Sequence, residues 1–287
     1  MVYITNFKLP DEVKEHYDLV NELRIYNGNY YPYGLFSSKS FTNIDFEPIT
    51  IFYGGNGSGK TTLLNVITEK VEASRSGRVD KGMLFRKYAS SCECDILHRY
   101  DCKEIKFITS DDVFDYLLDV RAINSGVNRQ KEDLALGYIT TKYGSKGSFD
   151  DYQDLKDRVS ARKQSKSQFI RTKLVNNNII EHSNGETALM FWQNEIKDHS
   201  VYILDEPENS LSAENQLKLV QFIEESARFY DCQFIISTHS PFILSLKDAL
   251  IYDLDENPVI PKKWNELKNV RVYYDFFKEH DNEFNDW

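Results

Sequence analysis

The chain is poor in cysteine, in positive charge and in long hydrophobic runs, and these shortages exclude several classes of protein. Four cysteines in 287 residues do not indicate a disulfide framework. No apolar stretch reaches the roughly 18 residues that a membrane-spanning helix needs. Residues 1–7 show a strand pattern, and they lack the charged region and apolar core of a secretory signal. The formal net charge of −10 disfavours a general nucleic-acid coat. We therefore expect a cytoplasmic protein that does not contact a membrane.

The most informative segment that the chain does contain is residues 54–62, which read G-G-N-G-S-G-K-T-T. Residues 54–61 match the phosphate-binding pattern G-x-x-x-x-G-K-[ST]. Glycines allow main-chain N–H groups to approach an anion, a lysine reaches the β- and γ-phosphates, and a threonine hydroxyl ligates Mg²⁺. The residues that we predict to bind the nucleotide here are Gly54, Gly55, Asn56, Gly57, Ser58, Gly59, Lys60, Thr61 and Thr62.

The residues on both sides of this segment support the prediction. Residues 49–53 form a β-branched and aromatic run that is typical of a strand, and residues 62–67 begin a helical pattern. A helix that starts here directs its N-terminus toward the phosphates. The alternative, a chance glycine-rich turn between a strand and a helix, explains the motif less well.

A pair of carboxylates follows a second buried strand pattern. Residues 201–204 are apolar and lead into Asp205 and Glu206. Ligands of open α/β sheets bind at the carboxyl ends of the strands, which is where these two side chains are expected. We predict that Asp205 holds Mg²⁺ together with Thr61, and that Glu206 accepts a proton from the attacking water. Two surface carboxylates that open a turn before Pro207 are the structural alternative.

A third strand pattern, residues 233–237, leads into His239. If this strand is a parallel neighbour of the Asp205 strand, His239 lies at the same sheet edge and can sense or polarise the γ-phosphate. The alternative role for a single histidine is a structural hydrogen bond. We predict a catalytic group of Glu206, His239 and Lys60.

Three segments together resemble the ATP-binding-cassette (ABC) superfamily of ATPases. They are G-G-N-G-S-G-K-T-T at 54–62, Y-I-L-D-E-P-E-N-S-L at 202–211 and I-I-S-T-H-S-P at 235–241. The similarity is to the soluble, AAA-like branch, which includes DNA-repair, chromosome-maintenance and phage-defence ATPases. It implies an α/β P-loop NTPase fold: a mixed sheet, antiparallel N-terminal strands, and a helical lobe inserted between the phosphate-binding loop and the signature motif.

The resemblance also implies a homodimer across ATP. Residues 182–186, H-S-N-G-E, are similar to a divergent signature motif before a helix. In the family this motif binds the γ-phosphate of ATP held by a second subunit, so Ser183 and Gly185 are the implied contacts across the dimer. A Ser-Asn-Gly turn that caps a helix is the alternative explanation.

The chain departs from the family pattern at two points. Ser212 stands where the family usually has an aspartate in the loop after the Asp-Glu pair. No glutamine follows the strand predicted at residues 105–109, where Ser110 and Asp111 stand instead. Ser110 or Asp111 could contact Mg²⁺ or water, while Asp111 and Asp112 could equally cap a helix that starts near residue 113.

Cysteine and histidine cluster in one short segment. Cys92, Cys94, His98 and Cys102 form C-x-C-x₃-H-x₃-C, in which the ligand types suit Zn²⁺ but the spacing is unusual. Reduced thiols without a metal are the alternative explanation.

A basic stretch runs from residue 156 to residue 173, with seven lysines or arginines against one aspartate. It could contact DNA or RNA phosphates or an acidic partner. The alternative, which the acidic chain favours, is a solvated face of the helical lobe.

The composition is typical of a packed globule, with 41% hydrophobic and 14% aromatic residues. We expect an ABC-type ATPase domain at 1–254, with a lobe at about 75–180, and a loosely attached C-terminal extension at 255–287. In the family an N-terminal aromatic side chain stacks on adenine, and Tyr33 and Phe36 are candidates, although core packing is the commoner role.

The interpretation is an Mg²⁺-dependent ATPase that dimerises around ATP, acting with a separate effector in bacterial defence or DNA maintenance. Two alternatives remain. The nucleotide-binding subunit of an ABC transporter predicts a glutamine near residue 110 and a strict L-S-G-G-Q, and the chain has neither. A non-hydrolysing nucleotide sensor or toxin-type module is disfavoured by Glu206.

Overall fold

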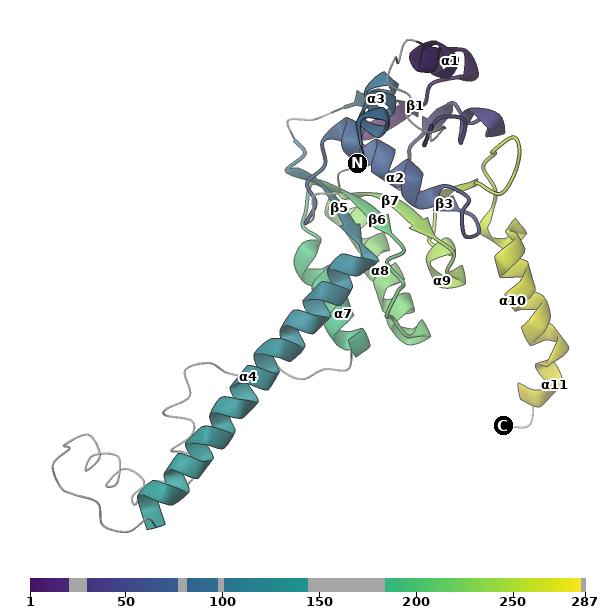
Figure 1. Ribbon diagram of the computed structural model, residues 1–287. Coiled ribbons are helices and arrows are strands. Elements are labelled where there is room, and N and C mark those ends of the chain that lie inside the picture. The colour runs from purple at the N-terminus through teal and green to yellow at the C-terminus, as the bar shows by residue number, and fades with distance from the viewer. Residues whose placement is uncertain (21–29, 77–81, 98–100, 144–183, 285–287) are drawn as a thin grey trace. The chain divides into compact units, whose positions relative to one another are not determined.

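The structure is a computed structural model that describes residues 1–20, 30–76, 82–97, 101–143 and 184–284 (Figure 1). The chain forms two compact units, each described by itself below. The first contains Met1–Phe114 and Asn184–Trp287, and the second contains Asp115–Ser183. Residues 144–183 lie outside the described residues, and with them the basic stretch 156–173 and Ser183.

A parallel sheet forms the centre of the first unit, with the strand order β5-β6-β7-β3-β8. Strands β3, β6 and β7 are buried along their whole length, and this explains why their sequences are continuous apolar runs. The strands predicted from the sequence at 49–53, 105–109, 201–204 and 233–237 all exist. The five strands are β3 (Ile49–Tyr53), β5 (Glu104–Thr109), β6 (Ser200–Asp205), β7 (Gln233–Thr238) and β8 (Leu250–Asp253).

The register of these strands brings the motif segments to one edge of the sheet. Tyr53, the last residue of β3, is paired with Thr238, and Asp205 at the end of β6 is paired with Ser237. Strand β7 therefore lies between the strand that precedes the phosphate-binding loop and the strand that carries Asp205. The expectation that the strands before Asp205 and His239 are parallel neighbours is confirmed.

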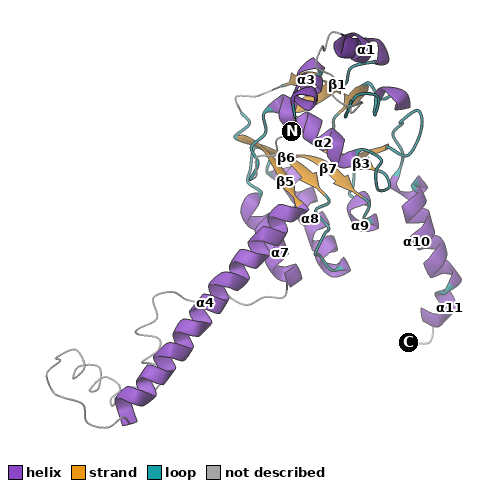
Figure 2. Ribbon diagram, in the orientation of Figure 1, coloured by secondary structure: helices purple, strands orange, loops and turns teal. Residues whose placement is uncertain are grey.

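Helices cover both faces of the parallel sheet (Figure 2). Helix α2 packs on one face, and four of its apolar side chains are fully buried, as the helical pattern after the loop predicts. Each such side chain contributes about 1.5–3 kcal/mol of burial free energy. Helices α8 and α9 lie on the opposite face, where α7 packs against α8. The four helices are α2 (Lys60–Val71), α7 (Asn184–Glu195), α8 (Ala213–Phe229) and α9 (Pro241–Leu244).

A second, antiparallel sheet has the order β2-β1-β4. Strands β1 (Ile4–Lys8) and β2 (Asn43–Asp45) confirm the predicted antiparallel N-terminal strands. The third strand, β4 (Glu93–Ile96), comes from the segment after the phosphate-binding loop, which the sequence did not indicate. Nearby helices are α1 (Glu12–Val20), the 3₁₀ helix η1 (Ser37–Lys39) and α3 (Met83–Ser91), which packs on α2.

One buried side chain joins the two sheets. The Gln233 carbonyl oxygen accepts hydrogen bonds from the main-chain N–H groups of Tyr3 and Ile4, both at 2.9 Å. The Gln233 amide donates to the main-chain carbonyl of Ile4 at 2.7 Å. Gln233 is fully buried, so these bonds satisfy polar groups that would otherwise be costly to bury.

Helix α4 (Ser110–Tyr143) follows β5 and continues into the second unit, which confirms a helical insertion after the phosphate-binding loop. The Asp112 carboxylate accepts hydrogen bonds from the main-chain N–H and the hydroxyl of Thr109, both at 2.8 Å. Asp112 therefore has the capping role that was one of the alternatives for this segment. None of the described helices, α4 included, is long and apolar enough to cross a lipid bilayer.

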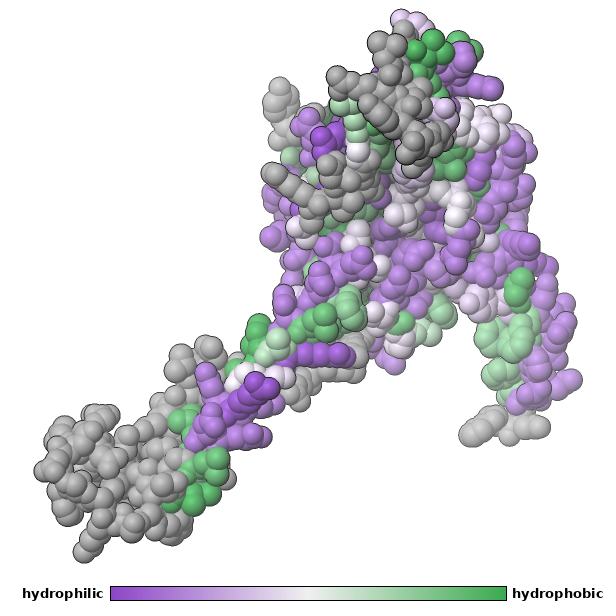
Figure 3. Space-filling model, viewed as in Figure 1, coloured by the Kyte–Doolittle hydropathy of each residue, from purple (hydrophilic) through white to green (hydrophobic). Residues whose placement is uncertain are grey.

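The C-terminal segment contains the 3₁₀ helix η2 (Trp264–Glu266) and helices α10 (Lys268–Glu279) and α11 (Asp281–Phe284). Contrary to the expectation of a loosely attached tail, Asp255 and Asn269 form hydrogen bonds with residues at the carboxyl edge of the parallel sheet. Hydrophobic side chains gather on α10 (Figure 3), where Val272, Phe276 and Phe277 are more than half exposed.

Candidate nucleotide-binding and catalytic site

The phosphate-binding loop connects β3 to α2, and its glycines are required by its geometry. Gly59 has a φ of +106°, which other residues rarely adopt, and it is the N-cap of α2. A Cβ at Gly54 would lie 2.5 Å from the hydroxyl oxygen and 2.8 Å from the Cβ of Ser58, so a side chain here would force the loop to shift. The loop residues Gly54, Gly55, Asn56, Gly57, Ser58 and Gly59 thus lie where the motif predicts, directly before the first turn of α2 with Lys60, Thr61 and Thr62.

The Lys60 side chain is almost fully buried inside the loop. Its ammonium donates to the main-chain carbonyls of Gly54 at 2.7 Å and Gly55 at 3.2 Å. The Glu206 carboxylate lies 3.9 Å from the same nitrogen. The ammonium is thus directed across the loop toward the carboxylate edge, as binding of β- and γ-phosphates requires.

Thr61 and Asp205 meet at the end of β6. The Thr61 hydroxyl donates to Asp205 Oδ1 at 3.1 Å, and the Ser237 hydroxyl donates to the same oxygen. Burial raises the pKa of Asp205, while the hydrogen bonds from Ser237 and Thr61 oppose this shift. A hydroxyl and a carboxylate oxygen in contact are the hard donors that Mg²⁺ prefers, so these residues fit the predicted metal.

Glu206 is held in a strained main-chain conformation. Its φ of +50° is unusual for a residue with a side chain, and its N–H donates to the carbonyl of Ser237 at 3.0 Å. Asn209 donates to the second carboxylate oxygen at 3.2 Å. The Glu206 side chain is 27% exposed, whereas Asp205 is only 9% exposed. Water therefore reaches Glu206 more readily, as a general base requires.

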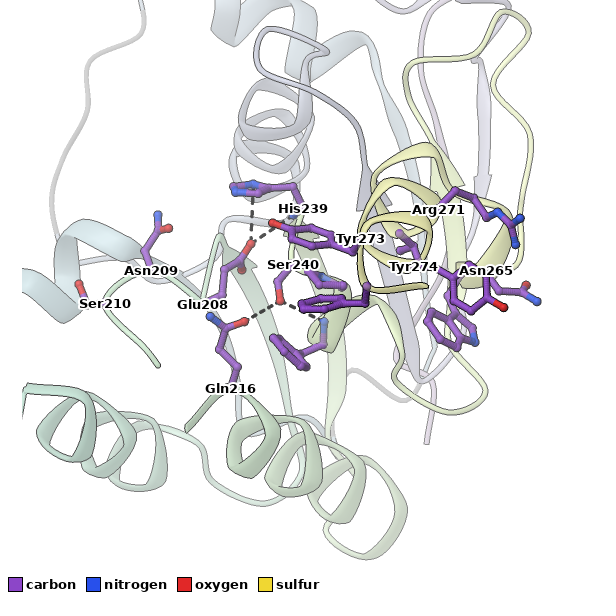
Figure 4. Close-up of a pocket in the computed structure, with 15 residues that line it drawn as sticks. Glu208, Asn209, Ser210, Gln216, His239, Ser240, Asn265, Arg271, Tyr273 and Tyr274 are labelled. Atoms are coloured by element: carbon purple, nitrogen blue, oxygen red, sulfur yellow. Dashed lines mark hydrogen bonds and ion pairs between the residues drawn. The ribbon is translucent and has the colours of Figure 1, made fainter. Parts of the chain in front are cut away.

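His239 follows β7, and its imidazole lies near the carboxylates of Glu206 and Glu208, the second of which Figure 4 shows beside it. Its Nδ1 lies 3.5 Å from Glu206 Oε1 and 3.8 Å from Glu208 Oε1. The structure thus brings together Lys60, Glu206 and His239, the group predicted from the sequence.

Glu208 is a site residue that the sequence analysis missed. It is 6% exposed, and its Oε1 accepts hydrogen bonds from the Thr238 hydroxyl at 2.6 Å and from the His239 N–H at 3.2 Å. Burial raises the pKa of this carboxyl. The only signal was its place in the run D-E-P-E, and an acidic residue in a turn gives no sign that it is buried.

Asp255 is a second missed residue. Its carboxylate accepts the main-chain N–H of Gly55, at 2.8 Å to one oxygen and 3.1 Å to the other. This contact joins the residue after β8 to the phosphate-binding loop across 200 positions of the chain, so no local pattern could have predicted it.

The aromatic candidates for adenine stacking differ in exposure. Phe36 is fully buried and Tyr33 packs edge-on against Tyr88, so both have the core-packing role that was the alternative. Tyr31, by contrast, is 49% exposed, and its hydroxyl shares a 2.6 Å hydrogen bond with the Thr62 hydroxyl. Tyr31 is thus an exposed ring directly beside the phosphate-binding loop.

The remaining predicted residues lie away from this group or outside the described residues. Gly185 lies in the first turn of α7, which begins at Asn184 as the signature-like pattern predicts. Ser212, which replaces the family aspartate, is the N-cap of α8 and accepts a hydrogen bond from the Asn215 N–H. Its side chain is therefore occupied in capping a helix.

The zinc prediction has no support from the described residues. Cys92 is buried beside the Tyr88 carbonyl, and burial raises the pKa of its thiol to about 12. The Cys102 thiol contacts the carbonyl of Glu104, and Cys94 lies in β4. Among the described residues no group of three or more His, Cys, Asp or Glu side chains could hold a metal ion, and His98 lies outside them.

A phosphate-binding loop after one strand, a carboxylate pair after a strand two places away and a histidine after the strand between them form the arrangement expected of a P-loop NTPase fold. Residues 128–245, less than half of the chain, match a family described as "AAA domain, putative AbiEii toxin, Type IV TA system". This match confirms the predicted resemblance to ABC- and AAA-like P-loop ATPases. A search of the curated proteins finds no match.

Solved structures with a similar fold include the SMC head domain from Thermotoga maritima, which is 15% identical. That comparison covers 91% of this chain and 99% of the other, with a TM-score of 0.42. A dimeric bacterial ABC transporter cassette is 14% identical over 77% of this chain and 88% of the other, with a TM-score of 0.36. A putative metal-chelate ABC transporter is 14% identical over 92% and 84%, with a TM-score of 0.41.

Proposed function

We propose that the chain hydrolyses ATP in an Mg²⁺-dependent reaction and that ATP closes a dimer of two copies. The observation that carries the proposal is the convergence of Lys60, Thr61, Asp205, Glu206 and His239 at one sheet edge. Residues 1–254 are the proposed ATPase domain, and residues 255–287 are its C-terminal extension.

The side chains have distinct proposed roles. Lys60 and the loop amides bind the β- and γ-phosphates, and Tyr31 offers its exposed ring to the base. Thr61 and Asp205 would hold Mg²⁺, which neutralises charge on the phosphates when it is bound. Glu206 accepts a proton from the attacking water. His239, whose Nδ1 lies 3.5 Å from a Glu206 carboxylate oxygen, lies beside it on the side of the γ-phosphate.

The second copy completes the site in this proposal. Ser183 and Gly185 of one copy would contact the γ-phosphate of ATP bound to the other. The support is the start of α7 at Asn184. Gly185 lies in the first helical turn, and the N-terminus of a helix favours the binding of an anion. Hydrolysis removes the γ-phosphate and with it the link between the copies, so the cycle is a two-state switch.

The proposed setting is a cytoplasmic bacterial defence or DNA-maintenance system in which a separate effector carries the output. The family description, which names a toxin of a type IV toxin–antitoxin system, supports a defence-related role. The proposal includes contact with nucleic acid through residues 156–173. Measuring the rate of ATP hydrolysis at low salt, with and without DNA or RNA, tests this part.

The test of hydrolysis is a Glu206→Gln variant. Turnover of ATP should fall by roughly 10²–10⁴-fold, because the carboxylate that accepts the proton is lost. Binding of ATP, followed with a fluorescent analogue, should stay within a few-fold of wild type. Glu214→Gln, an exposed residue on α8 that is paired with Lys218, is the matched control and should hydrolyse ATP normally. Unchanged turnover in Glu206→Gln would remove Glu206 from the base role.

A further inference from the structure

Asn269, near the start of α10, contacts two segments of the catalytic edge. Its side-chain amide donates to the main-chain carbonyl of His239 at 2.6 Å. Its main-chain N–H donates to the Tyr53 hydroxyl at 3.0 Å. Tyr53 is the last residue of β3, directly before the phosphate-binding loop. One residue of the C-terminal segment is therefore bonded to the ends of two neighbouring strands, β3 and β7.

The position of Asn269 in its helix makes this double contact possible. The N-cap of α10 is Leu267, so the N–H of Asn269 is in the first turn and has no partner within the helix. It is free to donate to the phenol oxygen of Tyr53. Burial raises the pKa of Tyr53, which keeps the phenol neutral.

Both peptide groups of His239 are held by hydrogen bonds. The carboxylate of Glu208 accepts its N–H at 3.2 Å, and the amide of Asn269 donates to its carbonyl at 2.6 Å. Two fixed peptide groups fix the direction of the Cα–Cβ bond between them. The imidazole is consequently aimed at Glu206 by main-chain restraints, although half of the His239 side chain is exposed.

A cavity of about 800 Å³ lies between the rest of α10 and the loop after β7 (Figure 4). Tyr274 and Phe277 line it from α10, Ser240 lines it from the loop, and Phe242 lines it from α9. The aromatic side chains of α10 thus face the loop across this space, while Asn269 bonds to it directly.

We propose that Asn269 is a positioning residue for His239, so that the C-terminal extension is a working part of the ATPase site. This inference rests on the proposed function, because His239 matters to turnover only if the chain hydrolyses ATP. Loss of the Asn269 amide should loosen the His239–Ser240 peptide, whose N–H keeps only its 3.0 Å hydrogen bond to the Thr238 hydroxyl, and should lower the rate of the chemical step. Binding of ATP should be little affected, because the bond to Tyr53 comes from the main chain and is kept in any variant.

The test compares three variants of the full chain. Asn269→Ala removes the side chain, and Asn269→Asp keeps its shape but removes the donor. Asn265→Ala, which alters a nearby asparagine that lines the cavity beside α10, is the matched control. We measure kcat and KM for ATP, together with the hydrogen-exchange rate of the Ser240 amide in the nucleotide-free protein.

The expected result is a fall in kcat of about two- to tenfold for both Asn269 variants, in line with one lost hydrogen bond, and a KM within twofold of wild type. The Ser240 amide should exchange faster in both variants, and Asn265→Ala should match wild type. A wild-type kcat together with wild-type Ser240 exchange in Asn269→Asp would overturn the inference. Absence of turnover in the wild type would instead overturn the proposed function, and the exchange measurement would still decide whether Asn269 restrains the loop.

Discussion

Two neighbouring carboxylates at the end of β6 have opposite environments. Asp205 is buried and receives hydrogen bonds from the Thr61 and Ser237 hydroxyls. Glu206 is more exposed and lies near the ammonium of Lys60 and the imidazole of His239. The buried carboxylate suits a fixed metal ion, and the exposed one suits exchange of a proton with water.

Asp205→Asn should stabilise the nucleotide-free protein while it abolishes stabilisation by Mg-ATP. Burial raises the pKa of Asp205, so its charge destabilises the folded chain above the ordinary carboxyl pKa, and this penalty disappears as the pH falls through the raised value. An uncharged amide removes the penalty at pH 7. A gain of about 1 kcal/mol would raise Tm by about 2–4 °C in a domain of this size.

The control for this prediction is Asp253→Asn. Asp253 is also buried at the end of a parallel strand, but Lys262 lies 3.0 Å from its carboxylate. Loss of the Asp253 carboxylate leaves the partly exposed Lys262 with Glu256 alone, so Asp253→Asn should lower Tm. Differential scanning fluorimetry at pH 7, with and without Mg-ATP, distinguishes the two cases. A lower Tm for Asp205→Asn in the absence of nucleotide would contradict the account.

Residues such as Lys60 and Asp205 could be predicted from the sequence because short motifs carry their chemistry. Glu208, Asp255 and Asn269 could not. Glu208 is bonded to Thr238, Asn269 to the main-chain carbonyl of His239, and Asp255 to the main-chain N–H of Gly55, which is 200 positions away in the chain. A contact of that kind is created by the strand order, which a single sequence does not contain.

At the scale of elements, the connection from β3 through the loop to α2 determines where ATP can bind. The turn depends on Gly59, whose Cβ would lie 3.3 Å from the side chains of Leu35 and Phe36. These two residues belong to a segment that no nucleotide motif includes. The phosphate-binding loop therefore packs against side chains from the N-terminal part of the chain.

Gly59→Ala should lower the free energy of unfolding by about 1–3 kcal/mol, because a side chain at a φ of +106° is strained. It should also weaken ATP binding. Gly126→Ala is the control: Gly126 lies in α4 with no atom within 4 Å of an added Cβ, and alanine in a helix is better by up to about 1 kcal/mol. Urea unfolding measures the free energy of unfolding of both variants. A Gly59→Ala variant as stable as wild type would refute the prediction.

The elements themselves were predictable to different degrees. Strands β3, β6 and β7 have largely apolar sequences because both of their faces are buried, and all four strands that the patterns indicated in this sheet are present. Strand β4 was not indicated, because Glu93–Ile96 is short and only partly buried. The role of α10 was not indicated either, because an amphipathic helix near the end of a chain gives no sign of which residues it contacts.

At the scale of the whole molecule, the first unit contains the nucleotide-binding edge and the second contains most of α4. A single copy supplies the phosphate-binding loop, the proposed metal-binding pair of Thr61 and Asp205, the proposed base Glu206, and His239. The proposed contact from Ser183 and Gly185 must come from a second copy, so ATP would be bound between two chains.

The measurement that tests this central claim most directly is the molar mass of Glu206→Gln by light scattering, with saturating Mg-ATP and with Mg-ADP. The account predicts twice the mass of one chain with Mg-ATP and the mass of one chain with Mg-ADP. Lys60→Ala should stay at the mass of one chain with either nucleotide. A Glu206→Gln protein that binds Mg-ATP and yet keeps the mass of one chain would contradict the account.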